Sequence, residues 1–357
     1  MSAATTRKSE SRLHGFLKNQ YVGGVLAILL LLVVNMIKDP SYLSIGYNSS
    51  NGALVGNLID ILRAAAPVMM IAVGMCLVIA TSGIDLSVGS LMVVAGAVSM
   101  EFLSTAPNTL GSALLALGMA LGLTLVLGLF NGFLVSVVGL QPFISTLVMM
   151  MAGRGIAKVV TGGQNTAGNN DAFRWIANGY VLGLPVVFLL ALAIVVLIAV
   201  LVRRSALGLM IESIGMDPTA ARMAGVNRRG LLLSVYSISG LMAGLAGVFA
   251  TASVMTVDVA KTGDQMEMDA ILAVVIGGTS LAGGKFNIAG ATIGALLIAT
   301  LDKTVVFLGI SSSATPAFKA IVIVILCLLQ SERVRQSFQR RRRTKAANQS
   351  EEKEVAA

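Results

Sequence analysis

A short polar segment between two long apolar runs carries the side chains of this sequence that are best suited to chemistry. The segment TSGIDLSVGS contains one carboxylate, Asp85, and several hydroxyls, among them those of Thr81, Ser82 and Ser87. An ionisable group between apolar runs is costly unless it meets water or a partner. Two interpretations stay open: Asp85 and Ser87 cap the next helix after a tight turn at Gly83, or the segment is the polar lining of a path through a membrane.

A second glycine-rich segment, GGTSLAGGKFNIAG at 277–290, echoes the first. VIATSG at 78–83 resembles VIGGTS at 275–280, and each precedes a helix of small residues, which hints at a duplicated, parallel half-unit. We expect Thr279 and Ser280 to line a translocation path together with the first segment. The AGGKF stretch resembles a phosphate-binding loop but has Thr279 and Phe286 where that motif needs glycine and a hydroxyl residue, so it does not bind ATP in that way.

The longest polar connection, Arg203 to Gly230, has more pattern than a solvated loop requires. Apolar and small residues recur at helical spacing, which predicts two short helices that meet at Gly215 to Pro218. Asp217 can cap the second helix, with Pro218 in its first turn. A docking element for a cytoplasmic partner explains this segment better than an unstructured loop.

The remaining charged and thiol residues give no catalytic constellation. Arg154 lies inside an apolar run and must meet water or an acid, either as a structural pair or as a substrate contact. Asp60 and Arg63 are three residues apart and can pair on one helix face. The two cysteines lie in separate apolar runs and the single histidine in a polar tail, so we predict no metal, no cofactor and no catalytic nucleophile.

The composition places the chain in a membrane. Of 357 residues 56% are hydrophobic and only 12% charged, and the mean hydropathy is +0.86. A soluble chain this apolar could not cover its surface, so its solvent must be lipid. The net charge of +9 comes from basic residues at both ends and in the 203–230 segment. That distribution is typical of membrane topology and not of a nucleic-acid groove.

The hydropathy pattern predicts an all-α integral membrane protein of about ten transmembrane helices. We place the spans near 21–37, 64–80, 86–100, 112–137, 142–160, 182–202, 231–254, 270–277, 288–301 and 316–329. The eighth is short and ends in glycine, as a broken or re-entrant helix does, and eight spans with two re-entrant pieces is the alternative. Pairs of glycines four residues apart predict helix packing at Gly118/Gly122, Gly128/Gly132, Gly240/Gly244 and Gly290/Gly294.

Basic residues predict the orientation. Four precede the first span, five lie in the 203–230 segment, and a basic tail follows the last span. All three should be cytoplasmic, which six crossings before the loop and four after it satisfy. We therefore divide the chain into an N-terminal cytoplasmic tail (1–20), a transmembrane domain (21–330) and a basic, disordered cytoplasmic tail (331–357) that touches anionic lipid.

Four motifs, in this order, resemble the ribose-type sugar permeases of bacterial ATP-binding-cassette importers. They are GMCLVIATSGIDLSVGSLMVVAGA, GLQPFISTLVMMMAGRGIA, the 203–227 loop and DAILAVVIGGTSLAGGKFNIAGATIGA. The resemblance extends from about residue 57 to 330. AAAPVMMIAVGM and QPFISTLVMMMAGRG are most similar to the fructose and galactofuranose importers.

The resemblance implies a permease subunit that translocates a monosaccharide and has no catalytic residue. It also implies a cytoplasmic ATP-binding subunit, a second permease, which we expect to be a different one in a heterodimer, and an extracytoplasmic sugar-binding protein. Fructose is the expected sugar, with galactofuranose or ribose as alternatives. The family's ATPase-coupling region falls on Gly208, Glu212, Ile214, Gly215, Asp217, Ala220, Ala221 and Gly225. The family's usual Asn after that glycine is replaced here by Met216-Asp217.

Two other classes of function remain to be compared. A secondary transporter driven by an ion gradient needs acids within the membrane or broken helices, and Asp85 could serve, but the 203–230 segment would then have no purpose. A membrane enzyme lacks a metal site, a nucleophile or a carboxylate cluster. We therefore favour the importer permease.

Overall fold

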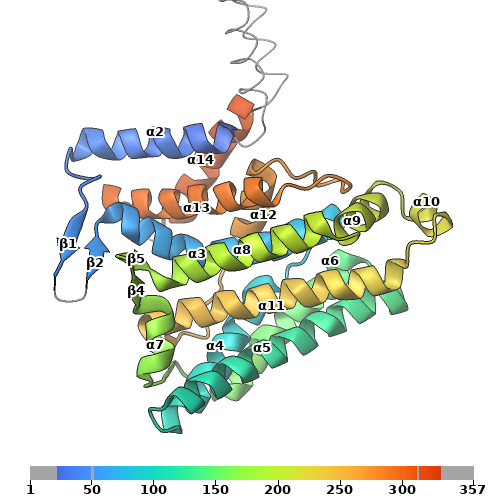
Figure 1. The fold of residues 1–357 in the computed structure, drawn as a ribbon, viewed down its shortest axis with the longest axis horizontal. Coiled ribbons are helices and arrows are strands. Elements are labelled where there is room, and N and C mark those ends of the chain that lie inside the picture. Colours follow the sequence, from blue (N-terminus) through green and yellow to red (C-terminus); the bar gives the residue numbers. More distant parts are fainter. Residues whose placement is uncertain (1–21, 50–51, 312, 331–357) are drawn as a thin grey trace, which may run out of the picture. The chain divides into compact units, whose positions relative to one another are not determined.

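The computed structural model describes residues 22–49, 52–311 and 313–330, which divide after Lys303 into two compact units. Helices dominate both units (Figure 1). The first unit contains α2 (Val22–Lys38), α3 (Asn57–Ala80), α4 (Val88–Thr105), α5 (Leu110–Phe133) continued by a π-helix (Leu134–Val138), α6 (Pro142–Val160), α7 (Asp171–Asn178), α8 (Val186–Arg204), α9 (Leu207–Met216), α10 (Pro218–Met223), α11 (Arg228–Val254), α12 (Met266–Ile276) and most of α13 (Ile288–Leu308). The second unit contains the end of α13 and α14 (Thr315–Gln330).

Short strands join some of the helix ends in antiparallel pairs. They are β1 (Gly46–Asn48) with β2 (Ala53–Val55), β3 (Thr166–Ala167) with β6 (Thr256–Val257), and β4 (Tyr180–Val181) with β5 (Leu184–Pro185). None of these pairs spans the unit, so the chain is an all-α membrane protein, as its composition predicts.

Helices α3 and α11 form the centre of the first unit. In its most apolar stretch α3 is 78% buried, whereas α5 with its π-helix and α6 are each 28% buried. A helix that is apolar on all sides suits such a central position. The outward faces of α5 and α6 carry large apolar side chains, including Leu114, Val126, Phe143 and Val148. In a membrane protein these faces are covered by lipid or by another protein.

Seven of the described helices are long and apolar enough to cross a membrane. They are α3, α4, α5 with its π-helix, α6, α8, α11 and α13. The other expected spans correspond to α2, α12 and α14, with 17, 11 and 16 residues. At ~1.5 Å per residue α12 extends only about 16 Å, roughly half of an apolar bilayer core. The eighth span, expected near 270–277 to be short, is therefore a short helix in the structure too.

Close packing at glycines sets the helix crossings in the first unit. A Cβ at Gly240 would lie 2.5 Å from the carbonyl oxygen of Thr124 and 2.9 Å from the Cα of Gly128, so α5 and α11 cross with their backbones in contact. Gly294 similarly packs against Ala273 of α12. At Gly118 and Gly122 an added Cβ would meet no atom of the described residues within 4 Å, so these two glycines do not pack against another helix of this chain.

Candidate functional site

Helices α3 and α12 end in the same backbone motif. In each, two successive N–H groups beyond the helix donate to carbonyls three and five residues earlier, which is the Schellman motif. The donor and acceptor pairs are Ser82 to Ile79 and Gly83 to Val78 after α3, and Gly278 to Val275 and Thr279 to Val274 after α12. The sequence echo thus has a structural counterpart, displaced by one residue from the match of letters.

The turn after α3 holds a serine in an unusual backbone conformation. Ser82 has φ 63°, the left-handed conformation that favours glycine, and Gly278 occupies the equivalent place after α12 with φ 87°. Contacts of the Ser82 hydroxyl offset the cost of this backbone conformation, because Oγ lies 3.0 Å from the carbonyl oxygen of Gly215 and 3.0 Å from that of Ala282. The side chain therefore connects three segments that are remote in sequence.

Those three segments form one junction, which we define as Ala80, Ser82, Gly215, Ala282 and Gly284. Besides the Ser82 contacts, Gly284 N–H donates to the carbonyl oxygen of Ala80 at 3.0 Å. Gly215 is buried there, and a Cβ on it would collide with the Ala80 carbonyl oxygen and the Gly284 nitrogen. The expected coupling loop and both glycine-rich segments thus meet at one place.

The expected coupling loop has the predicted pair of helices, α9 and α10, separated at Asp217. The Asp217 carboxylate accepts hydrogen bonds from the N–H groups of Thr219 at 2.8 Å and Ala220 at 3.1 Å, so the predicted cap is confirmed. Of the other coupling residues, Ile214 and Ala221 are buried, Glu212 is half-buried, and Gly225 is exposed with φ 85°. Gly208 packs against the end of α8, since a Cβ would lie 2.6 Å from the Val202 carbonyl oxygen.

Two methionines of this loop are strongly exposed: Met216 is 71% and Met223 is 86% exposed. Figure 1 shows α10 beyond the end of α9, at the opposite end of the first unit from α7 and the β4–β5 pair. Flexible methionines on a projecting helix suit contact with a partner protein.

Asp85 is buried between helices and fully hydrogen-bonded. One carboxylate oxygen accepts from Ser87 N–H at 3.0 Å and Ser87 Oγ at 2.5 Å, and the other accepts from Ser239 Oγ of α11 at 2.7 Å. Asn131 of α5 donates to Ser87 Oγ at 2.9 Å. Sequence reasoning missed Ser239 and Asn131, because nothing in their local sequence marks them as partners of a carboxylate.

The other expected path residues are held by local bonds. Thr81 donates to the Val78 carbonyl oxygen at 2.8 Å, and Thr279 Oγ1 accepts from Asn287 N–H at 3.1 Å. Ser280 N–H donates to the carbonyl oxygen of Lys285 at 3.1 Å and is part of the turn before α13. Each of these bonds lies in a turn or helix end that is close in sequence to a residue of the junction.

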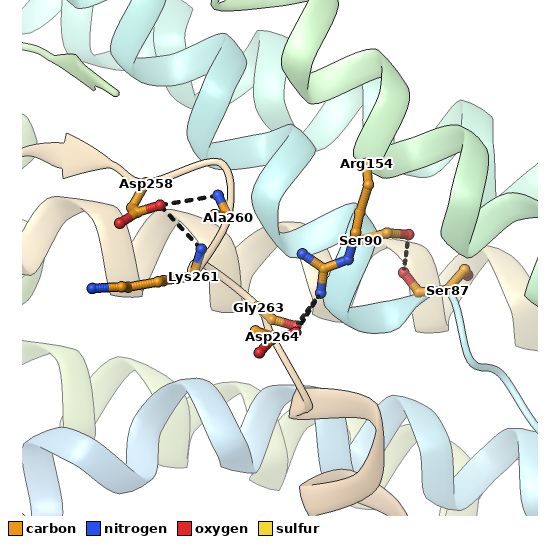
Figure 2. A network of polar contacts seen from close by, with 8 residues as sticks. All are labelled: Ser87, Ser90, Arg154, Asp258, Ala260, Lys261, Gly263 and Asp264. Atoms are coloured by element: carbon orange, nitrogen blue, oxygen red, sulfur yellow. Dashed lines mark hydrogen bonds and ion pairs between the residues drawn. The ribbon is translucent and has the colours of Figure 1, made fainter. Parts of the chain in front are cut away.

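Arg154 lies apart from the junction and binds the loop before α12. Its guanidinium donates to the Gly263 carbonyl oxygen at 3.3 Å and pairs with Asp264 at 3.4 Å (Figure 2). In the same loop Asp258 accepts from the N–H groups of Ala260 and Lys261, and these bonds hold the pKa of its carboxyl below the ordinary 3.8. Arg154 thus meets an acid, which agrees with its interpretation as a member of a structural pair.

At the other end of the unit a cavity of about 390 Å³ lies where α3 begins and α11 ends. Its walls include Asp60, Arg63, Pro67, Phe249, Ser253 and Lys303. The predicted pairing of Asp60 with Arg63 is not found: Asp60 pairs with Lys303 at 2.8 Å, and Arg63 donates to the hydroxyl of Tyr180. The guanidinium lies 5.3 Å from the centre of the Tyr180 ring, so α13 and β4 supply better partners than the neighbouring helix turn.

Comparisons with known proteins identify the family of the chain. Residues 57–329 match the family described as branched-chain amino acid transport system / permease component. The chain is 49% identical over 322 residues to the fructose import permease protein FruF of Bifidobacterium longum, covering 89% of each chain. It is 40% identical to the galactofuranose transporter permease protein YtfT of Escherichia coli, covering 87% of this chain and 89% of the relative.

It is also 38% identical to the ribose import permease protein RbsC of Escherichia coli, covering 87% of this chain and 93% of the relative. No solved structure matches the chain. The relatives are named as import or transporter permeases for sugars, and the family match at 57–329 includes the junction, the 203–230 loop and the residues of the cavity wall.

Proposed function

Since the chain belongs to the family described as branched-chain amino acid transport system / permease component, we propose that it is the membrane subunit of an ATP-driven importer that translocates a monosaccharide. The observation that carries the proposal is the junction, in which Gly215 of the projecting loop is seated between the ends of α3 and α12. A loop anchored in this way moves together with the ends of two helices of the bundle.

The mechanism requires no covalent step in this chain. A permease exposes its path alternately to each side, and the ATP-binding subunit stabilises one of the two states. A partner that docks on α9 and α10 would act on α3 and α12 through the Gly215 contacts. It would act on α11 as well, because α10 leads directly into that helix. Asp85 fastens the turn after α3 to Ser239 of α11, so these elements move as one body.

We propose a topology of ten crossings with both termini cytoplasmic. The end of α3 meets the α9–α10 loop in the junction. Because that loop joins α8 to α11, the end of α3, the end of α8 and the start of α11 lie on one side of the membrane, as this topology requires. In this topology α12, which alone spans about half of the apolar core, completes one crossing together with the loop at 255–265 that precedes it. The cavity at Asp60 is then extracytoplasmic.

The substrate and partners follow the relatives. Fructose is our first choice of sugar because a fructose import permease is 49% identical to this chain, and galactofuranose and ribose are the alternatives. The partners are a cytoplasmic ATP-binding subunit, an extracytoplasmic sugar-binding protein and a second, different permease.

Reconstitution tests the function. Proteoliposomes that contain this permease, its partner permease and the ATP-binding subunit should accumulate labelled fructose only with both ATP inside and the sugar-loaded binding protein outside. Accumulation driven by a proton or sodium gradient without the ATP-binding subunit would instead establish a secondary transporter and refute the proposal.

A further inference from the structure

The cavity of about 390 Å³ takes no part in the coupling route, and it has the size of a ligand site. Pockets for small molecules have volumes of roughly 300–1,000 Å³ and combine apolar walls with a few converging polar groups. Here the apolar part of the wall includes Ala64, Pro67, Val187 and Phe249. The polar part comes from α3, α11 and α13.

Arg63 has unused hydrogen-bonding capacity at this cavity. Its guanidinium donates to Tyr180, but the Nε atom is buried and has no partner within the described residues. Pro67, which also lines the cavity, has no N–H, so the carbonyl of Arg63 one turn earlier loses its α-helical donor. Arg63 thus brings an unused donor to the cavity wall. A buried polar atom without a partner is costly unless a ligand or water satisfies it.

The charges favour a neutral ligand with many hydroxyls. Asp60 and Lys303 form a pair whose side chains are 49% and 31% exposed, so each keeps bonding capacity. A hydroxyl both donates and accepts, and it therefore fits between a carboxylate and the guanidinium and ammonium groups. An anion would be drawn to Arg63 and Lys303 but repelled by Asp60.

We propose that this cavity is an entry site that binds one monosaccharide on the extracytoplasmic side of the permease. The inference rests on the proposed function, since it is the sugar and the topology of that proposal that place the ligand there. Arg63, Asp60 and Lys303 bind the hydroxyls, and the apolar wall covers the C–H face of the ring. Binding is weak, because the sugar must leave again toward the path.

Protection of an introduced cysteine from a thiol reagent tests the site directly. Ser253→Cys places a thiol at the cavity, and Ser104→Cys is the matched control. In both positions the native hydroxyl donates to the carbonyl three residues earlier, but Ser104 is exposed at the end of α4 and is not part of the cavity wall. The background carries Cys327→Ala, whereas Cys76 is fully buried and stays.

D-Fructose should slow maleimide labelling of Ser253→Cys and leave Ser104→Cys unchanged in the assembled transporter. At a sugar concentration ten times the dissociation constant the slowing is about tenfold. No protection by D-fructose, D-galactose or D-ribose, with wild-type transport intact, would overturn the entry site but not the proposed function. Protection by glycerol phosphate or by anionic lipid instead of sugar would assign the cavity to a headgroup and also overturn it.

A second measurement adds a substitution in the cavity wall and a transport readout. Arg63→Gln should abolish the protection of Ser253→Cys and slow transport at saturating loaded binding protein. Arg174→Gln, which removes an exposed arginine of α7 outside the cavity wall, should do neither. Equal effects of the two substitutions would show that only surface charge matters, and this result would refute the site.

Discussion

At the scale of one residue, Gly215 leaves no room for a side chain in the junction. Its neighbours in the junction are backbone atoms of Ala80 and Gly284, which cannot rotate away as a flexible side chain could. The sequence indicates that Gly215 lies between two short helices, but the close approach comes from the tertiary fold.

Gly215→Ala should destabilise the permease by about 1–3 kcal/mol, the usual cost of forcing an extra carbon into a packed site. The thermal unfolding midpoint of the purified permease measures this, and retention of the ATP-binding subunit during purification reports on coupling. Gly122→Ala is the control, because a Cβ there meets open space and alanine favours a helix by ~0.5–1 kcal/mol. A Gly215→Ala protein as stable as Gly122→Ala would contradict the packing described for the junction.

Asp85 allows the two interpretations of its role to be separated. Asn can still accept from Ser87, and Ser239 can turn its hydroxyl to accept from the amide, so Asp85→Asn should keep transport close to wild type. Asp85→Ala leaves buried donors without an acceptor, each costing about 1–3 kcal/mol. A stable, assembled Asp85→Asn complex that no longer transports would show that the charge itself is needed.

At the scale of elements, α9 and α10 combine a buried face with an exposed one. Ile211, Ile214 and Ala221 fix the pair to the bundle, whereas Met216 and Met223 extend away from it. The exposed face is therefore available to a partner without any change in the packing of the permease.

Met223→Gln should weaken retention of the ATP-binding subunit severalfold while the unfolding midpoint of the permease alone stays unchanged. The physical reason is the loss of apolar contact area at a docking surface. Leu182→Gln should change neither quantity, because Leu182 is an even more exposed apolar residue (95%) in the β4–β5 turn at the other end of the unit. Unaltered retention with Met223→Gln would exclude α10 from the interface.

The sequence predicts most elements but few of their contacts. Apolar runs predict the helices, and Asp217 with Pro218 predicts a helix start, because these signals are local. The bond from Ser239 to Asp85 joins residues 154 positions apart, and Lys303 with Asp60 joins residues 243 apart. Such pairs depend on how helices pack, which hydropathy does not encode, so the Asp60–Arg63 pair predicted from spacing alone was wrong.

At the scale of the whole molecule, the proposed orientation assigns each connecting segment to one side of the membrane. Thr219 of α10 and the junction belong to the cytoplasmic side, whereas Asn108 before α5 belongs to the opposite side. This division makes the topology testable without a structure of the complete transporter.

In intact cells, a membrane-impermeant thiol reagent should label Asn108→Cys and should not label Thr219→Cys until the membrane is permeabilised. Both positions are exposed, so access to the thiol depends on the side of the membrane. Labelling of Thr219→Cys from outside would reverse the orientation, and labelling of both would show that the loops do not lie on opposite sides.

Helix α11 connects the two ends of the first unit. It begins at Arg228 after the proposed docking helices α9 and α10, crosses α5 at Gly240, and contributes Ser253 to the cavity. Its 27 residues form a rod of about 40 Å, with arms of ~18–20 Å on either side of the crossing. If α11 tilts about that point, its two ends move in opposite directions. A displacement of about 2 Å at the Arg228 end then moves the cavity end by a similar distance in the opposite direction. Closing one side and opening the other would then be a single motion rather than two gates that must be synchronised.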